Sequence, residues 1–458
     1  MQISNELLNK YNVPVPRYTS YPPANHFEDF SKADYIDMLI ESNKLSPELI
    51  SIYIHIPFCN KMCFYCGCNA CHIGDGHLVK PYIDALKKEI SMVSAHLDKN
   101  RKVAQIHYGG GTPNAIPSEF IHEINAYLFE TFDFIEKPEI AIETHPGYIN
   151  EQYIEDLKNA KFNRFSMGIQ DFDNNVLKTV NREPARMPVK EIMDLMKHNS
   201  SEVAVNLDFI YGLPHQTTES FLETMDKALE LQPDRLVTFS YAHVPWIKKA
   251  QKILEKAGLP SANAKMDMFL AAYHFLAQGG YNPIGLDHFV RDTDELYIAV
   301  QNKQLHRNFQ GYATRRTTGQ VYAFGASAIS QTENGYAQNE KDTKAYIDLI
   351  ESGEFSTNKG MAVSQDQIKV REVITHVMCN KELNWNTIAQ KLDVQIDELK
   401  QHVIPDEQAI KLFENDGLIS MDHNGFKVTD TGSLFIRNIA AALDPEFKSQ
   451  QNKYSKSV

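Results

Sequence analysis

Short apolar runs rich in β-branched residues alternate with longer amphipathic stretches from about residue 50 onward. This alternation is typical of βαβ units, in which helices join buried strands and cover the sheet. The pattern predicts six strands, at residues 51–57, 103–108, 138–143, 163–169, 203–210 and 235–241. Apolar residues three and four positions apart predict the connecting helices, at residues 80–97, 117–130, 150–160, 187–198 and 217–231. A parallel sheet or a barrel follows, and right-handed crossovers place the carboxyl ends of all six strands on one face.

The remaining segments have other patterns. Residues 1–35 are rich in Tyr, Pro and Asn and show neither a helical nor a strand period, which predicts an extended arm. A disordered tail is the alternative, and the aromatic residues argue against it. Beyond the sixth strand a helix is predicted near 262–278, whereas the Gly-, Asn- and aromatic-rich segment 281–340 predicts no particular element.

From about residue 362 the pattern is mainly helical, with a short strand-like piece, GFKVT, before a last helix. This is the outline of a winged helix, which in the absence of a basic face usually serves packing and not DNA binding. We therefore expect three parts: an arm at 1–35, an α/β domain at 36–361 that includes an extension of the sheet, and a mainly helical domain at 362–458.

Composition and charge narrow the class of protein. Of 458 residues, 43% are hydrophobic and 23% charged, which is the balance of a soluble globular protein. The formal net charge is -13, and no block of Lys and Arg could neutralise a phosphate backbone, so nucleic acid is not an expected partner. The first ten residues lack a signal-peptide pattern and no run of 18 apolar residues exists, so we expect a cytoplasmic protein without membrane contact.

Five of the six cysteines lie between residues 59 and 71, which in a reducing compartment indicates a metal site. Cys59, Cys63 and Cys66 form a CxxxCxxC pattern in the loop directly after the first predicted strand. Three thiolates at these spacings can hold three corners of an iron-sulfur cubane and leave the fourth iron open to a ligand. The alternative is a zinc site built from four of six candidates, although zinc favours paired CxxC motifs. These candidates are Cys59, Cys63, Cys66, Cys68, Cys71 and His72.

Functional residue types recur where the predicted strands end. The second strand ends in Gly109, Gly110, Gly111 and Thr112, where missing side chains let backbone amides approach a ligand closely. The other strands contribute, in chain order, Glu143, Gln170, Asp208 and Ala242. A single acidic residue at such a position would more often be a helix cap or a solvated charge. Their coincidence at one rim, beside the cysteine loop, predicts a binding site for a cofactor that carries an amino-acid moiety.

The CxxxCxxC pattern, the GGGTP run and the acidic third strand together resemble the radical S-adenosylmethionine superfamily. Within it, the chain is similar to the family of oxygen-independent coproporphyrinogen III oxidases over nearly its whole length. The segments that carry this similarity are PRYTSYP, YIHIPFCNKMCFYCGCN, HYGGGTP, RFSMGIQDF, VNRE, DFIYGLP, TFSYAHVP, GLDHF, LHRNFQGY and GASAIS. The chain departs from the family pattern after Glu143, where Thr144, His145, Pro146 and Gly147 replace an acidic residue followed by Pro-Arg.

The resemblance implies a partial (β/α)6 barrel with one [4Fe-4S] cluster on Cys59, Cys63 and Cys66 and two molecules of S-adenosylmethionine. The residues expected to contact the first molecule are Tyr53, Gly110, Glu143 and Ile329. Those expected to contact the second are Tyr65, Gly111, Thr112, Gln170, Arg182, Asp208 and Ala242. Cys68, which matches a family cysteine outside the cluster, and His55 are the expected catalytic residues. The parts similar to those that surround the active site are the arm, Phe309 and Gln310, whereas Cys71 is expected to be a bystander.

The implied reaction converts two propionate side chains of coproporphyrinogen III to vinyl groups through a 5′-deoxyadenosyl radical, in heme biosynthesis. It requires a reducing partner such as flavodoxin or ferredoxin, and we expect a monomer. Arg17 and Arg307 lie in family-like segments and are the predicted partners of the substrate carboxylates, although exposed arginines are commonly solvated. One alternative is a related heme-binding chaperone, which would not need Cys68, the VNRE segment or the PRYTSYP arm. The other is a zinc-stabilised scaffold without catalytic activity.

Overall fold

The structure is a computed structural model that describes residues 3–44, 49–200, 202–314, 320–403, 405–447 and 454–457. The six predicted strands are present and run parallel, each paired with the next in chain order. They are β2 (Ile50–Ile56), β5 (Val103–Gly110), β6 (Phe134–Thr144), β7 (Arg164–Gln170), β8 (Ala204–Tyr211) and β9 (Arg235–Ser240). The prediction of a parallel α/β sheet is therefore confirmed, and the carboxyl ends of these strands share one rim.

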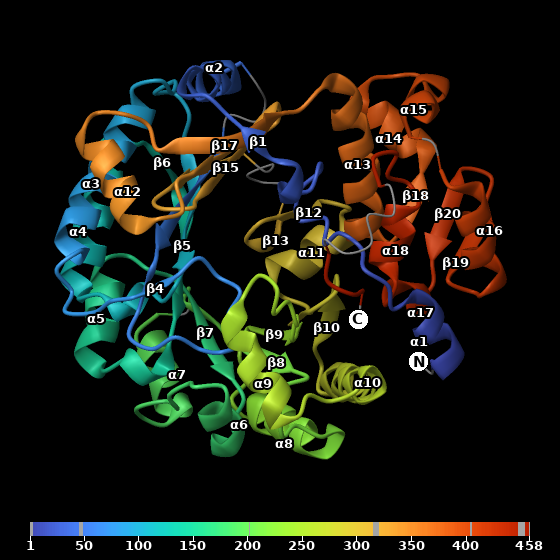
Figure 1. Ribbon diagram of the computed structural model, residues 1–458, viewed down its shortest axis with the longest axis horizontal. Coiled ribbons are helices and arrows are strands. Elements are labelled where there is room, and N and C mark those ends of the chain that lie inside the picture. Colours follow the sequence, from blue (N-terminus) through green and yellow to red (C-terminus); the bar gives the residue numbers. More distant parts are fainter. Residues whose placement is uncertain are drawn as a thin grey trace.

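Helices cover the outer face of this sheet (Figure 1). The predicted helices are confirmed as α3 (Val79–Ser94), α4 (Ser118–Thr131), α5 (Glu151–Asn159), α7 (Val189–Lys197), α8 (Thr218–Glu230) and α10 (Ala262–Gln278). Shorter helices that the pattern does not predict are η2 (Pro113–Ala115), η3 (Pro146–Tyr148), α6 (Asn174–Thr179), η4 (Lys249–Gln251) and α9 (Lys252–Ala257). α3 illustrates the packing, because Ile83, Leu86 and Ile90 recur at helical spacing and are fully buried.

The sheet is open and not a closed barrel. Beyond β9 it continues antiparallel through β11 (His288–Val290) and β10 (Asn282–Ile284). Beyond β2 it continues through β14 (Val321–Phe324), which is parallel to β2. Further strands then pair antiparallel as far as the opposite edge of the sheet. They are β15 (Ile329–Thr332), β16 (Gly335–Asn339), β17 (Thr357–Ala362) and β1 (Glu28–Asp29).

The segment 281–340, where the sequence predicts no particular element, supplies most of these added strands. It also contains α11 (Glu295–Gln301) and a hairpin of β12 (Leu305–Asn308) and β13 (Gly311–Thr314), and α12 (Thr343–Glu351) follows. Its described strands have three to five residues each. Such strands are too short for a recognisable period, and pairing with distant strands determines where they form.

The N-terminal arm is not extended throughout, and this prediction is wrong where three helices form within it. Asn5–Tyr11 forms α1, and α2 (Lys32–Ser42) begins before the predicted end of the arm, after the short helix η1 (Ala24–His26). α1 is too short to show a period, but the Ser4 side chain caps it by accepting a hydrogen bond from the Leu7 N–H. Between α1 and η1 the arm passes between the sheet and the C-terminal helices (Figure 1).

One arginine holds this arm in place. Arg437 is buried and donates hydrogen bonds to the carbonyl oxygens of Val15 and Pro16 in the arm. The same guanidinium donates to the carbonyl oxygen of Lys456 at 3.0 Å, near the C-terminus. The arm is therefore bound to the C-terminal region through backbone groups that the sequence pattern does not single out.

The chain beyond residue 362 is mainly helical, as predicted. Its helices are α13 (Gln365–Asn380), α14 (Trp385–Leu392), α15 (Ile396–His402), α16 (Glu407–Asn415), α17 (Asp430–Ser433) and α18 (Ile436–Ala441). Its antiparallel strands, in spatial order, are β18 (Glu382–Asn384), β20 (Gly425–Val428) and β19 (Ile419–Asp422). The strand-like GFKVT piece corresponds to β20.

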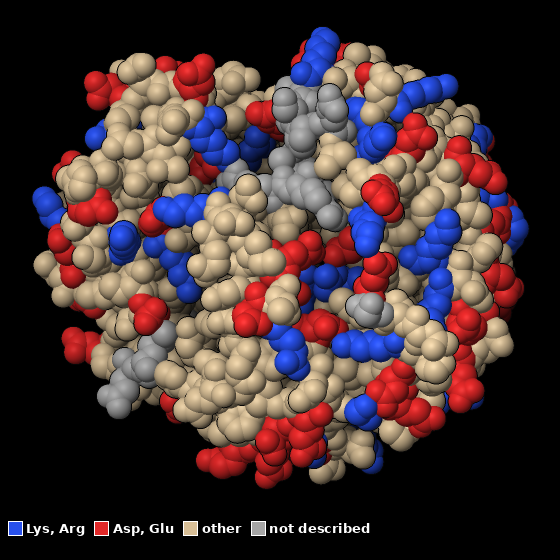
Figure 2. Space-filling view, turned by 180° about the vertical axis from the view of Figure 1, so that it is seen from behind, with Lys and Arg blue, Asp and Glu red and all other residues tan. Residues whose placement is uncertain are grey.

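The face of the molecule shown from behind carries charges of both signs (Figure 2). Lysine and arginine side chains are interspersed with aspartate and glutamate across it. In the part of the chain that the structure describes, no helix has the length and apolar character needed to cross a membrane.

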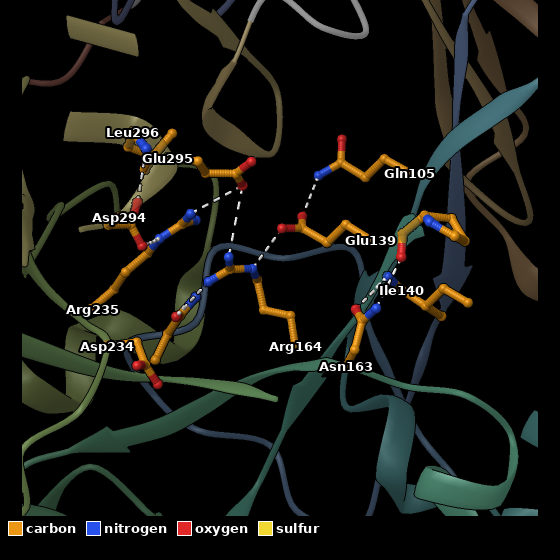
Figure 3. Close-up of polar contacts among 12 residues, drawn as sticks. Gln105, Glu139, Ile140, Asn163, Arg164, Asp234, Arg235, Asp294, Glu295 and Leu296 are labelled. Carbon is orange, nitrogen blue, oxygen red and sulfur yellow. Dashed lines mark hydrogen bonds and ion pairs between the residues drawn. The ribbon is translucent and has the colours of Figure 1, made fainter. Parts of the chain in front are cut away.

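A network of ion pairs lies at the amino-terminal ends of the parallel strands, opposite the rim (Figure 3). Arg164 at the start of β7 bonds Glu139 of β6 at 2.6 Å, and its side chain is 13% exposed. Arg235 at the start of β9 bonds Asp294 at 2.7 Å and Glu295 at 3.2 Å. Burial raises the pKa of Glu139, but the charges of Arg164 and Arg235 outweigh it and hold this pKa well below its usual range. The network joins α11 to the sheet and closes this end of the molecule.

Replacing Arg164 by Met should destabilise the protein by about 3–5 kcal/mol, because Glu139 would remain buried without its principal cation. The free energy of urea-induced unfolding measures this change. Lys190→Met is the matched control, since Lys190 pairs with Asp194 on the surface and should contribute no more than about 1 kcal/mol. Equal effects of the two substitutions would contradict the role given to the network.

Candidate active site

The cysteine loop lies directly after β2 and is closed by a short parallel pairing of β3 (Phe58–Cys59) with β4 (Cys71–His72). Cys59 is buried, and Cys63 and Cys66 are partly buried. Each of their sulfur atoms has a polar neighbour, since Cys59 Sγ lies 3.4 Å from the Thr112 hydroxyl and Cys63 Sγ accepts from Arg182 at 3.7 Å. Cys66 Sγ accepts from the backbone N–H of Cys68 at 3.4 Å.

The three thiols of this loop suit an iron-sulfur cluster. Among the residues that the structure describes, no three His, Cys, Asp or Glu side chains converge on a position that could hold one metal ion. A cubane binds each cysteine at a different iron, and donors to the cysteine sulfurs are features that tune such clusters. Hydrogen bonding from Cys68 lowers the pKa of the Cys66 thiol to about 6, whereas burial raises that of Cys59 to about 11.

The glycine run at the end of β5 packs against this loop. The Gly111 N–H donates to the Ile56 carbonyl at 2.8 Å, and the Thr112 N–H donates to the Phe58 carbonyl at 2.9 Å. A Cβ at Gly111 would lie 2.7 Å from the Pro57 carbonyl oxygen. At Gly110, where φ is +116°, a Cβ would lie 2.7 Å from His55 Cε1. The backbone can therefore approach the cysteine loop only because these side chains are missing.

A hydrogen-bonded chain of aromatic and acidic side chains lies on one side of the glycine run. Tyr53 stacks on His107 and lies 3.2 Å from His55 Nδ1, and His107 Nε2 lies 3.0 Å from Glu143 Oε1. The other nitrogen of His55 lies 2.9 Å from the Asn69 carbonyl, so both ring nitrogens are engaged. Burial lowers the pKa of His55 and, with the charge of Glu143, raises that of Tyr53. Both side chains are therefore neutral near pH 7.

A second set of polar side chains includes Arg182, whose guanidinium lies 3.7 Å from Cys63 Sγ. Arg182 is buried and donates to the Tyr65 hydroxyl at 3.1 Å and to the Gly168 carbonyl. Gln170 has a φ of +72°, and its buried Oε1 has no hydrogen-bond partner among the described residues. Asp208 accepts from Ser166 at 2.8 Å, and burial raises its pKa to about 6. The unpartnered amide oxygen and the buried carboxyl are acceptors that suit a bound polar ligand.

The segment after β9 contributes two contacts that the motifs do not indicate. Gln251 is buried and donates to the carbonyl oxygens of Tyr65 at 3.0 Å and Ala242 at 3.2 Å. Lys248 donates to the Cys68 carbonyl at 2.6 Å. These two side chains hold the cysteine loop against the end of β9. No local pattern could reveal them, because each role depends on a partner about 180 residues earlier in the chain.

Ile329 lies at the start of β15, within an apolar cluster away from these hydrogen bonds. Phe309 packs there edge-on against Tyr336 at 6.0 Å, and Phe27 of the arm stacks on Tyr336 at 5.4 Å. The backbone N–H of Gln310 donates to Asn308. Ile329, Phe309 and Phe27 of the arm therefore share one apolar cluster, and their relation to the active site stays a prediction.

The departure from the family pattern after Glu143 forms an ordered turn. Thr144 donates to the Ser166 carbonyl at 3.2 Å, and His145 stacks on Tyr148 at 4.2 Å. Asn114, which follows the GGGTP run, donates to the His145 carbonyl and accepts from its N–H. Burial and then the charge of Arg182 lower the pKa of His145 to about 2, so this ring is neutral. The turn links the ends of β5 and β6.

Comparison with known proteins places this site in a class. The model of the Radical SAM superfamily matches residues 53–228, which contain the cysteine loop, the glycine run and the rim as far as β8. The model of the HemN C-terminal domain matches residues 363–435. The fold and the three-cysteine loop thus define a radical S-adenosylmethionine protein.

Relatives define the family. The oxygen-independent coproporphyrinogen III oxidase of Synechocystis is 38% identical over 100% of this chain and 98% of its own length. The Escherichia coli protein of that name is 38% identical over 99% of this chain and 98% of its own length. A solved structure described as coproporphyrinogen III oxidase from Escherichia coli, a radical SAM enzyme, superposes with a TM-score of 0.88 over 97% of this chain and 99% of that one, at 36% identity. The chain belongs to the oxygen-independent coproporphyrinogen III oxidase family.

Replacing Cys63 by Ser should abolish cluster binding, because one of the three predicted thiolate ligands is lost. Iron and sulfide content, with the absorbance of the anaerobic protein near 400 nm, measures this. Cys71→Ser is the matched control, since Cys71 lies in the same loop but its sulfur neighbours Thr343, and it should keep its iron. A Cys63 variant with full iron content would contradict the ligand assignment.

Replacing Gly110 by Ala should weaken S-adenosylmethionine binding about tenfold or more while the iron content stays unchanged. The added Cβ would press on the His55 ring at a backbone conformation that favours glycine. Anaerobic calorimetry of S-adenosylmethionine binding measures the change. Gly67→Ala is the control within the cysteine loop, because nothing lies within 4 Å of a Cβ there. Unchanged binding in the Gly110 variant would show that the run is no cofactor cradle.

Proposed function

We propose that this chain catalyses the oxygen-independent oxidative decarboxylation of two propionates of coproporphyrinogen III to vinyl groups, which yields protoporphyrinogen IX. The single observation that carries the proposal is the contact between the three-cysteine loop and the glycine run, in a chain related over its full length to enzymes of that name. When bound, the [4Fe-4S] cluster and S-adenosylmethionine supply the one-electron cleavage and hydrogen abstraction that such a reaction requires.

Two sets of hydrogen-bonding side chains lie around the glycine run, and each could bind one molecule of S-adenosylmethionine. In the proposed arrangement the first molecule contacts Tyr53, Gly110, Glu143 and Ile329. The second contacts Tyr65, Gly111, Thr112, Gln170, Arg182, Asp208 and Ala242. The unpartnered Gln170 oxygen and the protonatable Asp208 support a ligand in the second position.

Cys68 and His55 have different proposed roles. Cys68 is exposed and hydrogen-bonded to Cys66, which supports a role on substrate beside the cluster ligands and not as one of them. His55 has both nitrogens engaged and fills the space that a Cβ at Gly110 would need, which supports a role in positioning Tyr53 and the glycine run.

A substrate with four carboxylates needs cationic partners when it is bound out of water. Arg17 lies in the arm, and its guanidinium makes no hydrogen bond or ion pair with a described residue. Burial by the surrounding protein and the charge of Arg307 lower the pKa of Arg17, and the charge of Arg17 also contributes to the lowered pKa of Lys265. Arg307 has a buried Nε without a partner among the described residues. Arg17 and Arg307 are therefore the proposed carboxylate ligands.

Replacing Arg17 or Arg307 by Gln should raise the KM for coproporphyrinogen III roughly 10- to 100-fold. A hydrogen bond to a charged group contributes about 1.5–3 kcal/mol, and its loss weakens binding by that factor. Anaerobic steady-state kinetics measures this. Lys99→Gln, at an exposed position before β5, is the control and should leave KM unchanged. An unchanged KM in both arginine variants would contradict this part of the proposal.

The proposed function is tested by anaerobic incubation with coproporphyrinogen III, S-adenosylmethionine and dithionite, followed by chromatography of the products. The expected products are vinyl porphyrinogens and carbon dioxide. Tight binding of heme without vinyl product would instead favour a heme chaperone and would overturn the proposal.

A further inference from the structure

The segment after β9 carries a local charge opposite to that of the whole chain. Between residues 247 and 256 there are four lysines and one glutamate, in a protein of net charge -13. The lysines are Lys248, Lys249, Lys252 and Lys256. The glutamate, Glu255, is already engaged by His243 Nε2 at 2.9 Å. This segment, together with Trp246, is called the 246–256 surface below.

The 246–256 surface is seated on the cysteine loop. Lys248 donates to the Cys68 carbonyl at 2.6 Å, and Gln251 donates to the Tyr65 carbonyl at 3.0 Å. Beneath it, Leu254 of α9 is fully buried in an apolar cluster that Phe64 and Tyr65 join. This surface therefore contacts the loop that carries the residues predicted to hold the cluster.

The same surface exposes large apolar side chains. Trp246 is 60% exposed, Ile247 is 64% exposed and Ile253 is 45% exposed. Single exposed apolar residues are ordinary, but three within eight positions, beside cations, are characteristic of an interaction surface. Lys249, Lys252 and Lys256 make no ion pair with any described residue, whereas on the outer helices Lys190 and Lys197 are paired with Asp194 and Asp234. The charges of the surface are thus left uncompensated.

We propose that the 246–256 surface docks an acidic one-electron carrier protein that reduces the cluster. The inference rests on the proposed function, because the carrier's role follows from that chemistry. In each transfer the reduced carrier loses one electron and the cluster gains it, so no proton or further reactant is needed. The lysines would attract the acidic surface of the carrier, and Trp246 and Ile247 would form the desolvated centre of the contact.

The test compares two reductants on the same holoenzyme. Lys249→Glu/Lys252→Glu should raise the apparent KM for reduced flavodoxin, an acidic flavoprotein, roughly tenfold at low ionic strength. The difference should shrink as salt is added, because screening weakens long-range attraction. With dithionite, which is small and needs no docking surface, the variant should form vinyl product at the wild-type rate. Trp246→Ala should raise the KM for flavodoxin with little dependence on salt.

The matched control is Lys99→Glu/Lys102→Glu, two exposed lysines before β5 at the opposite end of the strands. This double variant should behave as wild type with both reductants. The proposal is overturned if both pairs of substitutions act alike with flavodoxin, or if the 249/252 variant loses activity equally with dithionite. It is also overturned if the wild-type chain forms a dimer that Trp246→Ala dissociates, since the surface would then bind a second copy. If the wild-type protein formed no vinyl product with dithionite as reductant, the proposed function itself would be contradicted.

Discussion

The absence of side chains at the end of β5 is the constraint on which the site depends. Gly111 and Thr112 reach the carbonyl groups of the cysteine loop, and a Cβ at Gly109 would lie 2.8 Å from Glu143 Oε1. His55 occupies the space that a side chain at Gly110 would need. The cysteine loop, the side chains of Tyr53, His55 and His107, and the acidic end of β6 can therefore come together only because the glycines of this stretch have no side chains.

The amino-terminal and carboxyl ends of the parallel strands differ in how their polar side chains are paired. At the amino-terminal ends of the strands, Arg164 and Arg235 close the sheet with buried ion pairs, which resist rearrangement because a lone buried charge is costly. At the carboxyl ends, Gln170 Oε1 and Arg182 Nε are buried without a hydrogen-bond partner among the described residues. Buried ion pairs therefore lie at the end away from the rim, whereas the rim holds buried polar atoms that a bound ligand could satisfy.

The site also draws on segments far from the sheet. Phe27 of the arm stacks on Tyr336, and Arg437 of α18 holds the arm by the carbonyls of Val15 and Pro16. An arm held at both places lies beside the apolar cluster of Ile329 and Phe309. Radical chemistry benefits from exclusion of water, and an arm packed by backbone contacts can contribute to it without any catalytic side chain.

The sequence by itself determined the six parallel strands, their common rim and the three-cysteine loop. Hydrophobic periodicity and motif spacing are local properties of the sequence, so they can be recognised before it is known how the strands pair. It also indicated Gly110, Glu143 and Asp208, whose positions at strand ends follow from that order. Only the tertiary structure decided the short strands of 281–340 and the helix α1, which pairing and packing stabilise. It alone decided that Gln251 and Lys248 bind the cysteine loop, because these hydrogen bonds join residues about 180 positions apart. It also decided that the charge of Arg307 acts on Arg17. Contacts between residues so far apart in the chain cannot be predicted from local composition.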